Sequence, residues 1–285
     1  MTLLLNILVD GVAYGMVLFV MAVGLSITLG LMKFINLSHG AFAMAGGYGV
    51  AVLVGSHGWN FWAALLVALI ATGVFGAALE ALILRHLYRR PELQQVLFTI
   101  GLTFFLVATA NAIFGPQVRS IPLPASLSGS VDLGFRTLPT QRVFVLLAGV
   151  AAAALLTWII ARTRFGIWIR ASVDHADAAS GLGIPIRLVQ CLSFGAGAAL
   201  AGLGGVLGAE LMPLEPYYPL KYLVLMLVVV AVGGMGSIPG SLCTALVLGT
   251  VDTASKYLVS EWGSLLFFVA MGLLLAWRPR GILTR

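Results

Sequence analysis

The sequence predicts an all-α, polytopic integral membrane protein with about eight or nine transmembrane helices. Three features of its composition lead to this class. Only 9% of the 285 residues are charged, whereas soluble domains average roughly 25%. The mean hydropathy is +1.06. The 34 glycines agree with the class, because glycine lets membrane helices approach one another closely. We expect a single membrane domain over residues 1–285.

Nine apolar stretches justify this helix count, since a span needs about 20 apolar residues. The stretches cover residues 3–32, 40–56, 60–84, 93–114, 141–161, 189–211, 221–236, 241–259 and 262–277. The second stretch is short and contains Gly46, Gly47 and Gly49. It is therefore expected to be a half-helix or a re-entrant segment near residues 40–56.

The distribution of basic residues predicts the orientation of these spans. Eleven of the 16 basic residues fall in alternate loops, at Lys33, Arg85, Arg89, Arg90, Arg162, Arg164, Arg170, Arg187, Arg278, Arg280 and Arg285. Cytoplasmic loops collect Lys and Arg, so we place this side, and with it the C-terminus, in the cytoplasm. Residues 115–140, which contain four prolines, are expected to form an irregular periplasmic loop. The net charge of +6 follows from this bias and needs no nucleic acid.

The inner loop at residues 163–188 is expected to contain a short helix. Ser172 or Asp174 is placed to cap its start, and Gly181 or Gly183 to end it. The small residues 178–180 would then form one face that suits docking in a groove of a partner protein. An ordinary amphipathic connector explains the loop composition equally well.

Two glycine-bearing breaks interrupt the apolar stretches, and such paired interruptions can mark a transport pathway. The residues that they offer as a gate or pore hinge are Asn36, Ser38, His39, Gly40, Gly233, Gly234, Gly236, Pro239 and Gly240. A helix cap at the first break and a tight turn at the second explain the same residues structurally. We expect no catalytic residue, because a nucleophile and base must lie within reach of each other and adjacent helical residues such as Ser38 and His39 diverge.

Two acidic residues stand inside apolar stretches, where a carboxylate is costly and suggests a function. Asp252 has Lys256 four residues later, so that an ion pair on one helix face explains it equally well. Asp10 stands beside Gly11 and Gly15, a GxxxG pair that favours close helix packing, and its role stays open. The histidines are scattered over separate loops, so we expect no metal site.

Several segments together resemble a known family. They are residues 35–40 (INLSHG), 164–166 (RFG) with 170–171 (RA), 181–184 (GLGI), 233–240 (GGMGSIPG) and 278–283 (RPRGIL). In their order and spacing they resemble the branched-chain amino acid permeases of ABC importers, over nearly the whole chain. The inner loop resembles the ATPase-coupling loop of such permeases, and the positions that carry this likeness are Gly166, Arg170, Ala171, Asp174, Ala178, Gly181 and Gly183.

The resemblance implies a permease subunit in the bacterial cytoplasmic membrane that works with several partners. It would pair with a second permease, either a copy or a paralogue. Two cytoplasmic ATP-binding subunits would dock on the coupling loops, and a periplasmic binding protein would deliver the solute. ATP and Mg²⁺ would bind to the partner subunits, so the chain itself would be no enzyme and hold no cofactor. Consistently, the sequence lacks the phosphate-binding pattern GxxxxGK[ST].

One stretch departs from the family pattern. Many relatives carry a basic or polar residue several positions before the double glycine, whereas residues 223–230 read LVLMLVVV and carry no charge. The resemblance implies a branched-chain amino acid or a related small solute, and because of this departure urea or a short-chain amide is the alternative. A secondary carrier is a weaker interpretation, since it would need ion-binding acids on several spans.

Overall fold

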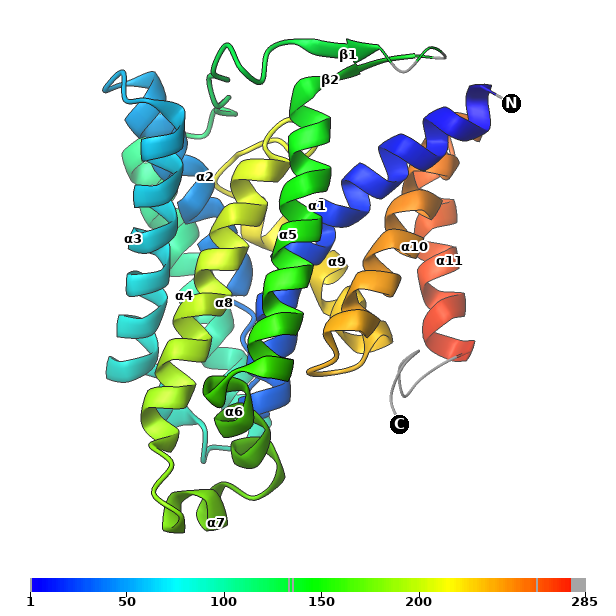
Figure 1. The fold of residues 1–285 in the computed structure, drawn as a ribbon. Coiled ribbons are helices and arrows are strands. Elements are labelled where there is room, and N and C mark those ends of the chain that lie inside the picture. The colour runs from blue at the N-terminus through cyan, green and yellow to red at the C-terminus, as the bar shows by residue number, and fades with distance from the viewer. Residues whose placement is uncertain (1, 133, 135, 260, 278–285) are drawn as a thin grey trace.

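The computed structural model describes residues 2–132, 134, 136–259 and 261–277 (Figure 1). The helices are α1 (Thr2–Met32), α2 (His39–Gly55), α3 (Phe61–Leu82), η1 (Leu84–Leu87), α4 (Glu92–Phe114), α5 (Thr140–Arg162), α6 (Arg164–Asp174), α7 (Ala176–Gly181), α8 (Ile186–Gly208), α9 (Tyr218–Gly233), α10 (Ile238–Leu258) and α11 (Gly263–Trp277). Two short antiparallel strands, β1 (Ser130–Asp132) and β2 (Thr137–Pro139), form a hairpin. The motif at residues 278–283 and the basic C-terminal residues lie outside the described residues.

The predicted fold class is confirmed: the chain is a bundle of apolar helices. Five helices are long and apolar enough to cross a membrane, namely α1, α3, α4, α5 and α8, and three shorter apolar helices lie within α2, α9 and α11. With α10, these helices cover the nine predicted stretches in the part of the chain that the structure describes. Many large apolar side chains on α3, α4 and α5 are exposed, as for Leu66, Ile70 and Val74, which suits contact with lipid.

The bundle has two distinct ends. Figure 1 shows β1 and β2 with the start of α1 at one end, called the hairpin end below, and α6 and α7 at the opposite end, called the α7 end. Helices α3, α4, α5 and α8 run between these two ends in alternating directions. The residues between α5 and α8 therefore gather at the α7 end, and the described residues of the segment 115–139 gather at the hairpin end.

Helix α1 forms the centre of the bundle. Its residues 17–23 are completely buried, and it packs mainly against α10 and α8. Glycines make this packing possible: a Cβ on Gly11 would lie 2.6 Å from the Cα of Thr250, and one on Gly15 would lie 2.7 Å from the carbonyl oxygen of Ala245. The GxxxG pair therefore does bring α1 and α10 into close contact.

Helix α2 is short and begins deep inside the protein. Its 17 residues extend for about 26 Å at 1.5 Å per residue, less than the roughly 30 Å hydrocarbon thickness of a bilayer. The Nε2 atom of His39 at its start lies 3.1 Å from the carbonyl oxygen of Met21, in the middle of α1. The predicted half-helix or re-entrant segment is thus a helix that is shorter than a full span and begins inside the protein.

Candidate functional site

The predicted coupling loop contains two short helices, where the sequence suggested one. Helix α6 is capped by Thr163, whose hydroxyl accepts a hydrogen bond from the Gly166 N–H at 3.2 Å. Neither predicted cap is formed: Ser172 lies inside α6 and donates to the Trp168 carbonyl at 2.6 Å, and α7 starts after His175 without a side-chain cap. Gly183 follows α7 with φ +85°, a left-handed conformation that favours glycine, so this residue does end the turn.

Two residues of the loop fix α6 against the end of α5. A Cβ on Gly166 would collide with the carbonyl oxygens of Ile160 and Ile159, so only glycine allows this approach. The guanidinium of Arg170 donates to the carbonyl oxygen of Ile160, one of the last carbonyls of α5, which have no partner within that helix. Helices α5 and α6 are therefore joined as one rigid element.

Helix α7, in contrast, has few contacts with the rest of the protein. Ala178 and Gly181 are exposed, and Leu182 is 85% exposed. Ala179 is only 3% exposed and points into the protein. The prediction that residues 178–180 together form one docking face is therefore wrong. The loop offers a partner a surface of small residues with one prominent leucine, which the sequence pattern did not identify.

A polar cavity of ≈ 560 Å³ separates this loop from the end of α1. Lys33 and Met32 line one side of it, and Asp174, His175 and Asp177 line the other. Asp174 thus borders a water-accessible space, and Ala171 next to Arg170 is half-buried in α6. The loop has room to move towards α1.

The first break, at residues 33–38, is closed by its own polar side chains. The Asn36 carbonyl oxygen Oδ1 accepts hydrogen bonds from the Ser38 N–H at 3.1 Å and from the Ser38 hydroxyl at 2.6 Å. Asn36, Ser38 and His39 are all 1% exposed or less. Asn36 and His39 therefore bond to backbone groups that water cannot reach, at Ser38 and Met21, and the Ser38 hydroxyl holds Asn36 in place.

Helix α4 supports the same break with residues that were not predicted from the sequence. Gln95 accepts a hydrogen bond from the Ile35 N–H at 3.3 Å through Oε1. Its Nε2 atom donates to the carbonyl oxygens of Leu87 and Arg90 at 3.3 and 3.0 Å. Gln95 is 4% exposed. The signal in the sequence was a polar residue that starts an apolar span, with Thr99 and Thr103 at helical spacing behind it.

Gly40 lies against the start of α9, not against the later glycine break. A Cβ on Gly40 would lie 3.0 Å from the Cα of Pro219 and 3.0 Å from the Cε of Met226. The two short apolar helices α2 and α9 thus meet at their N-terminal ends inside the bundle. This arrangement brings both helix starts next to α1, where Tyr218 donates to the sulfur of Met21 at 3.4 Å.

The second break is a tight turn anchored to α1. Gly234 and Gly236 have φ values of +93° and +80°. The Gly236 N–H donates to the carbonyl oxygen and hydroxyl of Ser26 at 3.0 and 3.2 Å. Ser237 then caps α10 by accepting from the Gly240 N–H at 3.1 Å, and Pro239 stands in the first turn of α10. Both breaks are thus attached to α1, at Met21 and at Ser26.

Asp10 fastens the outer segments of the hairpin end together. Its carboxylate accepts hydrogen bonds from Arg136 at 2.9 Å, from Arg142, and from the hydroxyl of Tyr257 at 2.7 Å. These partners come from the hairpin loop, α5 and α10. The carboxylate is therefore fully paired, and its role in this structure is to join α1, α5 and α10.

Asp252 forms the ion pair that its spacing allowed. Its carboxylate lies 2.6 Å from the Lys256 ammonium, which also stands over the ring of Tyr14.

A third buried acid, Glu80, was not predicted from the sequence, although it stands in the apolar run FGAALEALIL. Glu80 is 0% exposed and accepts from Arg85 and Tyr88, both at 3.0 Å. Among the described residues no three metal-ligating side chains lie together.

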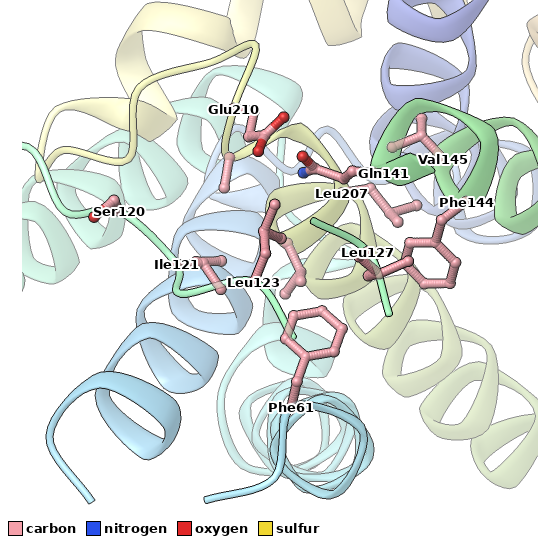
Figure 2. A pocket seen from close by; sticks show the side chains of 12 residues that line it. Phe61, Ser120, Ile121, Leu123, Leu127, Gln141, Phe144, Val145, Leu207 and Glu210 are labelled. Carbon is pink, nitrogen blue, oxygen red and sulfur yellow. The ribbon is translucent and has the colours of Figure 1, made fainter. Parts of the chain in front are cut away.

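At the hairpin end, a second cavity of ≈ 170 Å³ lies between the starts of α3 and α5 and the end of α8 (Figure 2). Glu210 and Gln141 stand next to each other at its polar end, and with its nitrogen turned towards Glu210 the Gln141 side-chain amide donates to that carboxylate. Partial burial raises the pKa of the Glu210 carboxyl above its usual range, and nearby Arg142 opposes this shift.

Comparison with known proteins gives a consistent result. Residues 7–275 match a family described as branched-chain amino acid transport system, permease component. The chain is 28% identical to the high-affinity branched-chain amino acid transport system permease protein LivH of Escherichia coli K12, over 97% of this chain and 94% of the relative. It is 26% identical to the corresponding BraD protein of Pseudomonas aeruginosa, over 98% and 95%. The LivM permease of E. coli is also 26% identical, over 96% of this chain and 69% of that protein.

Proposed function

Because the chain belongs to the branched-chain amino acid transport permease family, we propose that it forms half of the translocation path of a binding-protein-dependent ABC importer for branched-chain amino acids. The observation that supports this most directly is the geometry of the inner loop. Helix α6 is fixed to α5 by Gly166 and Arg170, while α7 is exposed beyond it. A force applied to α7 would therefore act on a transmembrane helix.

The proposed mechanism follows from this connection. An ATP-binding subunit docks on α7 and Leu182, and its closure on ATP pushes the loop into the cavity beside Lys33. Since α5 moves with α6, it shifts relative to α1, to which both helix breaks are attached. This shift changes which side of the membrane the path is open to. Hydrolysis takes place in the partner subunit, which also holds ATP and Mg²⁺.

The sidedness and the partners complete the proposal. The α7 end faces the cytoplasm and the hairpin end faces the periplasm, as the basic residues of the α7 end favour. Helix α11 runs towards the α7 end (Figure 1), which supports a cytoplasmic C-terminus. The match to both LivH and LivM, two permeases of one E. coli system by name, favours a related second permease as the partner. A periplasmic binding protein supplies the solute to the hairpin end.

Substitutions of the exposed Leu182 test whether the loop docks on the ATP-binding subunit. Leu182→Asp places a charge at the proposed contact with the ATP-binding subunit, and we expect at least a tenfold loss of leucine-stimulated ATP hydrolysis in the reconstituted transporter. Leu182→Met is the matched control, because it keeps an apolar side chain of similar size, and it should retain activity. Normal coupling in Leu182→Asp would contradict the role assigned to this loop.

A further inference from the structure

The cavity at the hairpin end has the size of a small aliphatic group. Its volume is ≈ 170 Å³, and an apolar cavity of about 150 Å³ is known to hold benzene. Phe61, Leu127, Val145 and Leu207 line it and are each 6% exposed or less. The cavity is therefore a preformed apolar chamber that accommodates four to six carbon atoms, on the order of an isobutyl group.

The walls of this chamber are held by aromatic contacts. Phe61 and Phe144 both pack edge to face against Trp62, with ring centroids 5.3 Å apart in each pair. The loop residues Ile121 and Leu127 pack against the same cluster. Because these contacts join α3, α5 and the loop of residues 115–129, the chamber has a fixed shape and does not depend on a ligand to form.

The opposite end of the chamber is polar. Figure 2 shows Glu210 and Gln141 next to each other at one end and Phe61 at the other. Gln141 is 6% exposed, whereas Glu210 is exposed and thus stands where the chamber opens. The carboxylate gives this mouth a negative group, and such a group recognises an ammonium ion or another cation.

A positive group stands beside this mouth. Arg142 follows Gln141 in α5, and it shares the single carboxylate of Asp10 with Arg136. The guanidinium of Arg142 also acts on Glu210, so it stands between two acids and can attract the carboxylate of a ligand whose ammonium group pairs with Glu210. The mouth thus offers a carboxylate and a guanidinium next to an apolar chamber, which is the complement of a zwitterionic aliphatic amino acid.

We propose that this cavity is a receiving site for the transported amino acid on the periplasmic side of the permease. The branched side chain enters the apolar chamber, the ammonium group binds Glu210 in place of the Gln141 amide, and the carboxylate faces Arg142. This inference rests on the proposed function, because it takes the hairpin end as the entry side. It implies that the permease itself selects for side chains of three or four carbons, in addition to any selection by the binding protein.

The experiment measures equilibrium binding by calorimetry to the full-length permease, purified with its partner subunits in nanodiscs without the binding protein. The probes are L-leucine, glycine, 3-methylbutylamine and 4-methylpentanoate. Leucine should bind at least tenfold more tightly than glycine, which cannot fill the chamber. Glu210→Gln should weaken the binding of leucine and of 3-methylbutylamine about tenfold, because it removes one charge-assisted contact. It should not weaken the binding of 4-methylpentanoate, which has no ammonium group and is repelled by the Glu210 carboxylate.

Two further variants keep the result interpretable. Glu215→Gln is the matched control. Glu215 lies in the same loop between α8 and α9 as Glu210, but it pairs with Lys221 at 2.8 Å and does not line the chamber. It should bind leucine normally. Leu123→Trp fills the chamber from its loop side and should weaken every aliphatic probe at least tenfold, while co-purification with the partner subunits reports that the variant is folded.

The outcomes distinguish this inference from the proposed function. Equal leucine binding in the unmodified protein, Glu210→Gln and Leu123→Trp would overturn the site. Absence of leucine binding in a transporter that still takes up leucine with its binding protein would also overturn it, and would leave the proposed function intact. A transporter that takes up no branched-chain amino acid under any condition would refute the proposed function, and this inference with it.

Discussion

The two breaks at the ends of α2 and α9 differ in how they satisfy their backbone groups. The break at residues 33–38 uses side chains, with Asn36 bonded to Ser38 and Gln95 to Ile35. The break at residues 234–237 uses backbone geometry, with Gly234 and Gly236 at positive φ. Both sequences looked alike as glycine-bearing interruptions, yet only the second depends on glycine for its conformation.

This difference has a consequence for movement. The glycines of the second break pack directly against backbone atoms. Because backbone atoms cannot adopt another rotamer to form a different contact, we expect this turn to keep one shape. A segment held by side-chain hydrogen bonds can be released when those bonds break, at a cost of about 1–3 kcal/mol for each buried group left without a partner. We therefore expect the first break to be the movable element and the second to be the fixed turn.

The largest effect is expected at the fixed turn. A Cβ on Gly240 would collide with the Gly233 carbonyl oxygen, and one on Gly233 would lie 2.7 Å from the Gly240 carbonyl carbon. Gly240→Ala must separate two backbone segments, so it should lower the free energy of unfolding by about 3 kcal/mol, at the upper end of overpacking costs. The thermal unfolding midpoint of the purified transporter measures this loss.

The matched control for this substitution is Gly101→Ala. Gly101 lies within α4, and a Cβ added there would meet no atom within 4 Å outside its immediate helical neighbours. Alanine should therefore be neutral or add up to about 1 kcal/mol through helix propensity. Equal losses in both variants would show that the turn has room to adjust, and would remove the distinction between a fixed and a movable break.

An intermediate effect is expected at the first break. Gln95→Met keeps the size of the side chain but leaves the Ile35 N–H and the Arg90 carbonyl oxygen without their side-chain partner, while the Leu87 carbonyl oxygen keeps the Arg90 N–H. We expect a loss of about 2 kcal/mol, together with faster hydrogen exchange at residues 33–37. Gln94→Met changes the exposed neighbour and should alter neither quantity. Unchanged exchange in Gln95→Met would mean that Gln95 does not hold the segment.

The sequence predicted features that depend on local pattern. The apolar stretches predicted the helices, and Gly183 was one of the two glycines predicted to end the helix of the inner loop. Both features depend on hydropathy and glycine positions that are visible in a few consecutive residues. The contact of Asp10 with Arg136 spans 126 residues, and that of Gln95 with Ile35 spans 60. Such pairings depend on how the helices pack, which a single sequence does not reveal, and for this reason the roles of Asp10 and Gln95 required the structure.

The smallest effect is expected at Ser26, a side chain on α1 that contributes to the fixed turn. Its hydroxyl bonds to Gly236 and Ser241, but the Gly236 N–H also donates to the Ser26 carbonyl oxygen at 3.0 Å. Ser26→Ala therefore leaves no orphaned backbone group and only the buried Ser241 hydroxyl without its partner, so the loss should be about 1 kcal/mol. Ser255→Ala, whose hydroxyl bonds only within α10, is the control. If Ser26→Ala destabilised the protein as strongly as Gln95→Met, the second break would also depend on side chains, and the contrast between the two breaks would be lost.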